Sequence, residues 1–119
     1  MAALETVPDY VKSARGLLLD TVEPYRYPDA DFVEGLNFAL LQARRLRPDL
    51  FLVSAKLTLR DAPSYSASDT SAVDIDPQYR LALLYYIAGH VQLQDTEDVQ
   101  DSRAAAFLQK SNNLFLAIG

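Results

Sequence analysis

The chain has 119 residues, of which 50% are hydrophobic and 23% are charged, and its formal net charge is -5 at pH 7. This composition predicts one globular domain with one core rather than a disordered chain. The acidic balance argues against tight general binding to DNA or to an anionic membrane, and the absence of cysteine excludes disulfides and thiolate metal sites.

The first half of the chain predicts two amphipathic helices. It opens on MAALETVPDY, which is acidic and does not resemble a signal peptide, so we expect a protein made in the cytosol. The first helix is predicted over residues 8–19, with Pro8 in its first turn. After a proline-containing loop, the second helix is predicted over residues 29–46, and Pro48 ends it. The two apolar stripes consist of Val7, Tyr10, Val11, Ala14, Leu17 and Leu18, and of Phe32, Val33, Leu36, Ala39, Leu40 and Ala43.

The middle of the chain predicts a strand and a long loop. In residues 52–60, a mostly polar set of side chains alternates with an apolar set, with a period of two. This alternation indicates a half-buried strand. The segment 61–76 is rich in Ser, Ala and Asp and is predicted to be a loop, with a short second strand near residues 72–75. Because one strand is not stable alone, either the loop returns as a hairpin or another copy of the protein pairs with the strand edge.

Two further helices are predicted in the second half. Asp76 is a favourable N-cap and Pro77 a favourable first residue for the third helix. Residues 81–91 are apolar almost all round, so this helix either lies at the centre of the core or presents one face to a partner. An acidic segment precedes a fourth helix, predicted over residues 98–117. The final LFLAIG is apolar, and we expect it to pack on another surface.

The expected architecture is mainly α: a small antiparallel bundle of about four helices, with an inserted strand or β-hairpin. We expect one domain over residues 1–119, with a loop insertion at about 61–76. No enzyme activity, metal or cofactor is expected. His90 is the only histidine, the acidic segment lacks the glycine of an EF-hand, and neither a GxSxG motif nor a glycine-rich phosphate loop is present.

The segment ARRLRPDLF places Arg44, Arg45 and Arg47 within four residues. One interpretation is electrostatic, because cations in the last turn of a helix complement its exposed carbonyls by about 0.3–1 kcal/mol each. The other is a phosphate or subunit contact, although no aromatic interleaving or nucleic-acid motif accompanies the arginines. Tyr85 and Tyr86 are further interface candidates, since tyrosine buries an apolar ring while its hydroxyl stays in water.

Several motifs occur in an order that resembles a known family. The first half carries ARGLLLDTVEPYRYPDADFVEGLNFALLQARRLRPDLF, and the second carries DPQYRLALLYYIAGHVQLQDTEDVQDSRAAAFLQKSNNLFLAIG. Together they resemble the head-to-tail adaptor proteins of tailed phages, also called connector or neck proteins. The matching residues of the first half are Leu18, Leu19, Asp20, Tyr25, Arg26, Tyr27, Asp29, Leu36, Asn37, Ala39, Leu46, Arg47, Pro48, Asp49 and Phe51.

The resemblance implies a structural protein of the virion neck. Such adaptors form a homo-oligomeric ring, commonly twelvefold, beneath the portal protein, and they carry tail or nozzle proteins. DNA passes through the ring without specific binding, which the negative net charge suits. The family's C-terminal part often docks on the portal, which implies Leu114, Phe115, Leu116 and Ile118 as portal-facing residues. The alternative is a small cytosolic helical regulator that binds DNA or a protein partner through the three arginines of ARRLRPDLF.

Overall fold

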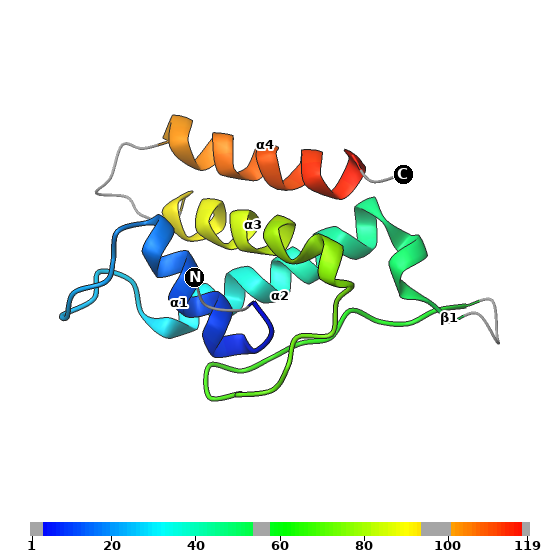
Figure 1. The fold of residues 1–119 in the computed structure, drawn as a ribbon, viewed down its shortest axis with the longest axis horizontal. Coiled ribbons are helices and arrows are strands. Elements are labelled where there is room, and N and C mark those ends of the chain that lie inside the picture. The colour runs from blue at the N-terminus through cyan, green and yellow to red at the C-terminus, as the bar shows by residue number, and fades with distance from the viewer. Residues whose placement is uncertain (1–3, 54–57, 94–100, 118–119) are drawn as a thin grey trace.

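The computed structural model describes residues 4–53, 58–93 and 101–117. The expected fold class is confirmed, because these residues form four α helices and one two-stranded antiparallel hairpin. Helix α3 (Arg80–Leu93) lies between α4 (Asp101–Ala117) on one side and α1 (Val7–Leu17) and α2 (Asp29–Leu46) on the other, as Figure 1 shows.

Helix α1 ends two residues earlier than predicted. At its start the Asp9 carboxylate accepts a hydrogen bond of 3.0 Å from the backbone N–H of Thr6, which lowers the pKa of Asp9. At its end Leu19 has φ of 60°, in the left-handed region, and the N–H of Asp20 donates to the carbonyl of Arg15 over 2.9 Å. The helix therefore stops, although apolar residues continue the stripe to Leu19.

Helix α2 has the predicted bounds, which local signals define. Asp29 and Asp31 lie in its first turn, where a carboxylate favours the positive end of the helix dipole. Pro48 ends the helix and opens a short 3₁₀ helix, η1 (Pro48–Phe51). Phe51 of that turn is fully buried and joins the core, whose largest buried side chains include Tyr10, Phe32, Leu36, Leu83 and Phe115.

The single continuous strand predicted over residues 52–60 is wrong. Strands β1 (Leu52–Val53) and β2 (Thr58–Leu59) pair with each other antiparallel, with Leu52 opposite Leu59. The period of two continues on both sides of a hairpin, so the alternation reads like one long strand. Residues 54–57, between the two strands, lie outside the described part of the chain.

The loop at residues 61–76 returns to the start of the chain. The short second strand expected near residues 72–75 is reduced to one β-bridge, between Thr6 and Ala72. Beside this bridge the N–H of Val73 donates to the carbonyl of Glu5 over 2.7 Å. The loop is therefore held against the segment that leads into α1.

A second anchor attaches the same loop to α2. The side-chain amide of Asn37 donates to the carbonyl of Tyr65 over 2.9 Å and accepts from the N–H of Tyr65 over 2.8 Å. These two reciprocal bonds satisfy both backbone groups of Tyr65. Asn37, one of the residues that carry the family resemblance, thus positions the inserted loop.

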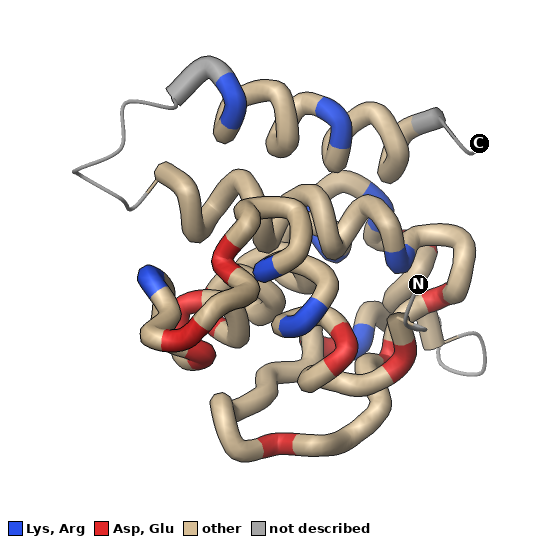
Figure 2. The backbone as a smooth tube through the Cα atoms, turned by 60° about the vertical axis from the view of Figure 1, so that its left-hand side comes forward, with Lys and Arg blue, Asp and Glu red and all other residues tan. Residues whose placement is uncertain are grey.

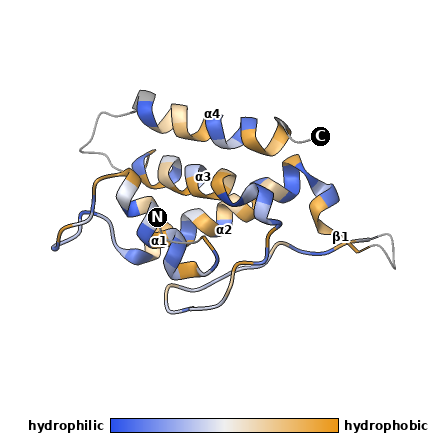
Figure 3. Cartoon of the chain, in the orientation of Figure 1, coloured by the Kyte–Doolittle hydropathy of each residue, from blue (hydrophilic) through white to orange (hydrophobic). Residues whose placement is uncertain are grey.

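Helix α3 is the central helix of the bundle, and α1, α2 and α4 all contact it. Hydrophobic positions run along it from its first turn to its last (Figure 3). Of the two explanations for its apolar character, the central position in the core is the one observed. Asp76 caps the start as predicted, since its carboxylate accepts from the N–H of Gln78 over 3.0 Å, but a 3₁₀ turn, η2 (Pro77–Tyr79), precedes the α helix.

Close packing joins α3 to α4. A Cβ added at Gly89 would lie 2.8 Å from Cγ of Leu108 and 3.0 Å from the carbonyl of Ala104, so a larger residue does not fit without a shift. The hydroxyl of Ser111, which is fully buried, donates to the carbonyl of Ala82 over 2.7 Å. Helix α4 is observed from Asp101, and the first residues of its predicted range, 98–100, lie outside the described part.

Candidate interaction surface

Two of the predicted site residues, Arg47 and Phe115, meet where the C-terminal ends of α2 and α4 come together. Nη1 of Arg47 donates to the carbonyl of Phe115 over 2.9 Å, and Nε and Nη2 donate to the two carboxylate oxygens of Asp49 at 3.0 Å each. The bonds between Arg47 and Asp49 raise the pKa of Arg47 and lower the pKa of Asp49. The guanidinium also lies 5.4 Å from the centre of the Tyr79 ring, which stacks on Phe115. Arg47 therefore joins the ends of two helices.

The other two arginines have different positions. Nε of Arg44 donates to the carbonyl of Arg60 over 2.9 Å, which attaches α2 to the end of the hairpin. Arg45 is exposed and makes no hydrogen bond or ion pair with another residue in the described ranges. Two of the three arginines thus donate to backbone carbonyls, but these carbonyls belong to other segments of the chain and not to the end of α2, as the helix-end interpretation had it.

The expected portal-facing residues separate into three groups. Phe115 is fully buried in the core, so its assignment as a portal-facing side chain is wrong. It follows the helical stripe that packs on α3, which buries its ring against Tyr79. Leu114 is half-buried against the core and Leu116 is exposed, so these two keep some accessible surface. Ile118 lies outside the described residues.

The two candidate tyrosines pack against different neighbours. The ring of Tyr85 lies 6.1 Å from that of Phe107 in α4, and Nζ of Lys110 lies 4.7 Å from its centre. Tyr86 lies beside the imidazole of His90, and burial raises its pKa. The contacts of both tyrosines among the described residues are thus with α4 and with His90 rather than with the arginines.

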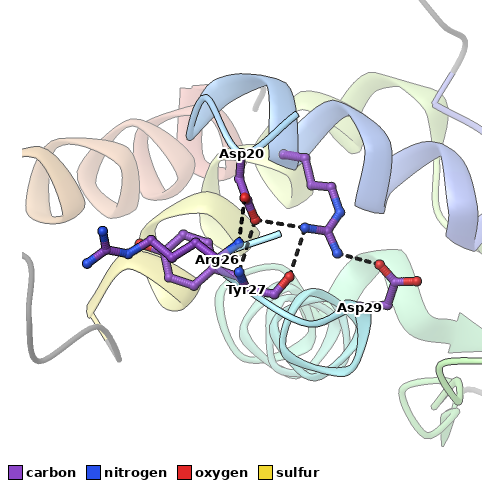
Figure 4. Close-up of polar contacts among 5 residues, drawn as sticks. Asp20, Arg26, Tyr27 and Asp29 are labelled. Atoms are coloured by element: carbon purple, nitrogen blue, oxygen red, sulfur yellow. Dashed lines mark hydrogen bonds and ion pairs between the residues drawn. The ribbon is translucent and has the colours of Figure 1, made fainter. Parts of the chain in front are cut away.

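Sequence reasoning missed a buried polar cluster, here called the Arg15 cluster: Arg15, Asp20, Arg26, Tyr27 and Asp29. Nη1 of Arg15 donates to Asp20 and to the carbonyl of Tyr27, each over 2.8 Å, and Nη2 pairs with Asp29 (Figure 4). The Asp20 carboxylate also accepts the N–H groups of Arg26 and Tyr27, over 2.7 and 3.0 Å. These bonds hold the α1–α2 loop against the helix from which it leaves.

Arg15 is enclosed as well as hydrogen-bonded. Its guanidinium lies 3.9 Å from the centre of the Tyr25 ring and 4.7 Å from that of Phe32, and its side chain is buried. The sequence contains a signal for a buried ion pair at this position, because Arg15 directly follows Ala14 of the apolar stripe and precedes an acid-containing loop. With both Nη1 and Nη2 bonded within the chain, Arg15 stabilises the fold.

A hollow of about 270 Å³ lies beside this cluster. Its lining includes the apolar side chains of Val7 and Val11 together with charges of both signs, among them Lys12 and Asp69. No group of three His, Cys, Asp or Glu residues that could hold a metal ion occurs in the described ranges. Over the same ranges, no helix has the length and apolar character needed to cross a membrane.

Comparisons with models of protein families, with curated proteins and with solved structures found no match.

The exposed apolar side chains of the described residues include pairs at two ends of the molecule, whose long axis spans 48 Å, in addition to others on α2, α3 and α4. Leu19 and Val22 are largely exposed in the α1–α2 loop, and Leu52 and Leu59 are about half exposed in the hairpin. Figure 1 shows the loop and the hairpin projecting at opposite ends of the long axis. These two apolar ends are candidate contact surfaces, because a loop tip or hairpin in water ordinarily carries polar side chains.

Proposed function

We propose that the chain is a structural head-to-tail adaptor of a tailed bacteriophage. In this role copies form a ring beneath the portal protein in the virion neck, extend the DNA channel and carry tail or nozzle proteins. Several residues that carry the family resemblance make specific contacts that hold the fold together, which supports treating them as one related group. Asp20, Tyr27 and Asp29 bind Arg15, and Arg47 of LRPDLF binds α4.

The observation that carries the proposal is the pair of different apolar ends. A contact between unlike surfaces of identical subunits is heterologous, and it generates a closed ring when the rotation between subunits permits closure. Here the loop end of one copy, with Leu19 and Val22, would bind the hairpin end of the next, with Leu52 and Leu59. A chain that exposes apolar residues at both ends has the surfaces that such a ring requires.

The distribution of positive charge supports a channel component over a regulator that binds nucleic acid. Lys and Arg positions are spread over several elements rather than collected in one stripe (Figure 2). Arg44 and Arg47 bind backbone carbonyls within the chain, which leaves Arg45 as the exposed member of the three. A net charge of -5 also disfavours adhesion of passing DNA.

Electron microscopy of the chain mixed with the portal protein of the same phage tests the proposal. We expect a ring stacked on the portal with matching symmetry. The decisive variants are Val22→Ser at the loop end and Leu59→Ser at the hairpin end, each of which should prevent ring closure. Leu81→Ser is the matched control, because Leu81 and Leu59 are both 44% exposed, and it should leave the ring intact.

Mixing the two defective variants sharpens the test. Each variant retains one intact end, so one productive contact can form between a Leu59→Ser copy and a Val22→Ser copy, and assembly then stops at a pair. Rings that form equally well from either variant would contradict end-to-end assembly. A chain that neither binds the portal nor forms a ring under any of these conditions would refute the adaptor role.

A further inference from the structure

The solvent-facing side of α2 carries an apolar pair where an amphipathic helix normally has polar residues. Glu34, Phe38, Leu41 and Arg45 are spaced by four, three and four residues, so they lie along one line of the helix. We call this line the α2 stripe. Phe38 is 42% exposed and Leu41 is 55% exposed, while the opposite side of α2 is buried in the core.

The charges at the two ends of the α2 stripe are opposite. Glu34 lies at the N-terminal end with its side chain 51% exposed, and Arg45 lies at the C-terminal end, exposed. The stripe is symmetric about the point between Phe38 and Leu41: Glu34 precedes Phe38 by four residues, and Arg45 follows Leu41 by four. Turning a second stripe end to end therefore places each glutamate opposite an arginine, and each Phe38 opposite a Leu41.

We propose that the α2 stripe is the contact of a two-fold dimer, in which the α2 helices of two copies of this chain pack antiparallel. Each Glu34 faces Arg45 of the second copy, and the phenyl and leucine side chains fill the centre. A parallel arrangement would set glutamate against glutamate and arginine against arginine, so charge complementarity selects the antiparallel one. The surface is self-complementary, as a two-fold contact requires.

Helix α3 holds the acidic half of the stripe in place. Nε2 of His90 lies 3.2 Å from Oε1 of Glu34, and the imidazole lies 5.1 Å from the Phe38 ring. These contacts reduce the freedom that Glu34 and Phe38 would lose on association. The inference goes beyond the proposed function: a two-fold contact does not close a ring, so the dimer is a state of the free chain, distinct from the assembly on the portal.

Sedimentation equilibrium of the whole chain without portal tests the dimer. Four central apolar side chains make a contact smaller than a standard stable interface, so we expect Kd on the order of tens to hundreds of micromolar. Glu34→Arg places like charges at both ends of the contact, and so does Arg45→Glu. Each variant should raise Kd by at least about tenfold, which corresponds to about 1.4 kcal/mol.

Mixing the two charge variants gives the sharpest result. In a pair made of one Glu34→Arg copy and one Arg45→Glu copy, both ends again carry opposite charges. The mixture should therefore dimerise with a Kd within about threefold of the original. The doubly reversed chain, with both substitutions, should also recover. Thermal unfolding of each variant confirms that the fold is retained.

The apolar centre has its own matched pair of variants. Leu41→Ser should abolish dimerisation, whereas Leu116→Ser on α4 should leave it unchanged, because Leu41 and Leu116 are 55% and 57% exposed. A chain that stays monomeric up to about 1 mM would overturn the proposal. So would a dimer that the charge reversals leave unaltered. If Leu41→Ser instead weakens only portal binding, the stripe belongs to the portal contact and self-pairing is refuted.

Discussion

Replacement of Arg15 by methionine tests whether the Arg15 cluster holds the α1–α2 loop. The side chains of Arg15 and Asp20 are each 6% exposed and 2.8 Å apart. Removing one partner of such a buried pair costs about 3–5 kcal/mol, because the other charge remains buried without its counter-charge. The pair with Asp29 adds less than about 1 kcal/mol, since that carboxylate is largely exposed. We expect Arg15→Met to lower the free energy of unfolding by about 3–5 kcal/mol.

Urea denaturation followed by circular dichroism measures this loss at pH 7. Arg26→Met is the matched control, because Arg26 contributes its backbone N–H to the cluster and the substitution retains that group. It should change the unfolding free energy by less than about 1 kcal/mol. Adding Asp20→Asn to Arg15→Met removes the uncompensated charge, so the double variant should lose less than the sum of the single variants. Equal losses for Arg15→Met and Arg26→Met would refute the reasoning.

Three further predictions concern helix packing and helix ends. Gly89→Ala and Gly16→Ala gain similar helix propensity, but only the new methyl group at residue 89 contacts α4. Urea denaturation should therefore find the Gly89→Ala variant less stable than the Gly16→Ala variant by about 1–3 kcal/mol. Equal stability of the two variants would contradict tight packing at Gly89. Ser111→Ala removes the buried bond to Ala82 and should cost about 1 kcal/mol in the same assay, and an unchanged midpoint would contradict it. The lowered pKa of Asp9 stabilises the fold above its ordinary value of 3.8, and this contribution is lost as pH falls through the folded pKa. Asp9→Asn should therefore be less stable than the original chain at pH 7, by about 0.3–1 kcal/mol, and the difference should shrink as pH is lowered through the folded pKa of Asp9. A difference independent of pH would contradict that account.

Helix boundaries were predicted well where the signals are local. Pro48 ends α2 and Asp76 caps the turn before α3, and both effects act within a few residues. The hairpin was misread because the alternation of side chains keeps the same period in both of its strands, so two short paired strands look like one long strand in the sequence. Pairing between Leu52 and Leu59 depends on a reversal of the chain that periodicity does not encode.

The candidate site was harder to predict because its decisive contacts are distant in sequence. Arg47 binds the carbonyl of Phe115, which lies 68 residues later, and the Phe115 side chain is part of the core rather than of a free surface. Arg15 pairs with Asp29, which lies 14 residues later in the sequence, on the other side of a loop. The α2 stripe was hidden for a different reason: Phe38 and Leu41 look like ordinary helix residues until the burial of the opposite side shows that they face solvent.

The bridge between Thr6 and Ala72 has a consequence for the order of folding. The segment before α1 pairs through its backbone with residues of the 61–76 loop, which are synthesised much later. The hydrogen bond from the N–H of Val73 to the carbonyl of Glu5 joins the same two segments. During translation, which proceeds N-terminal first, α1 therefore emerges before the loop that holds its beginning. We expect the backbone amide of Val73 to gain protection from hydrogen exchange late in refolding, after the amides at the centre of α2. The start of the chain would then be among the last parts of the domain to become native.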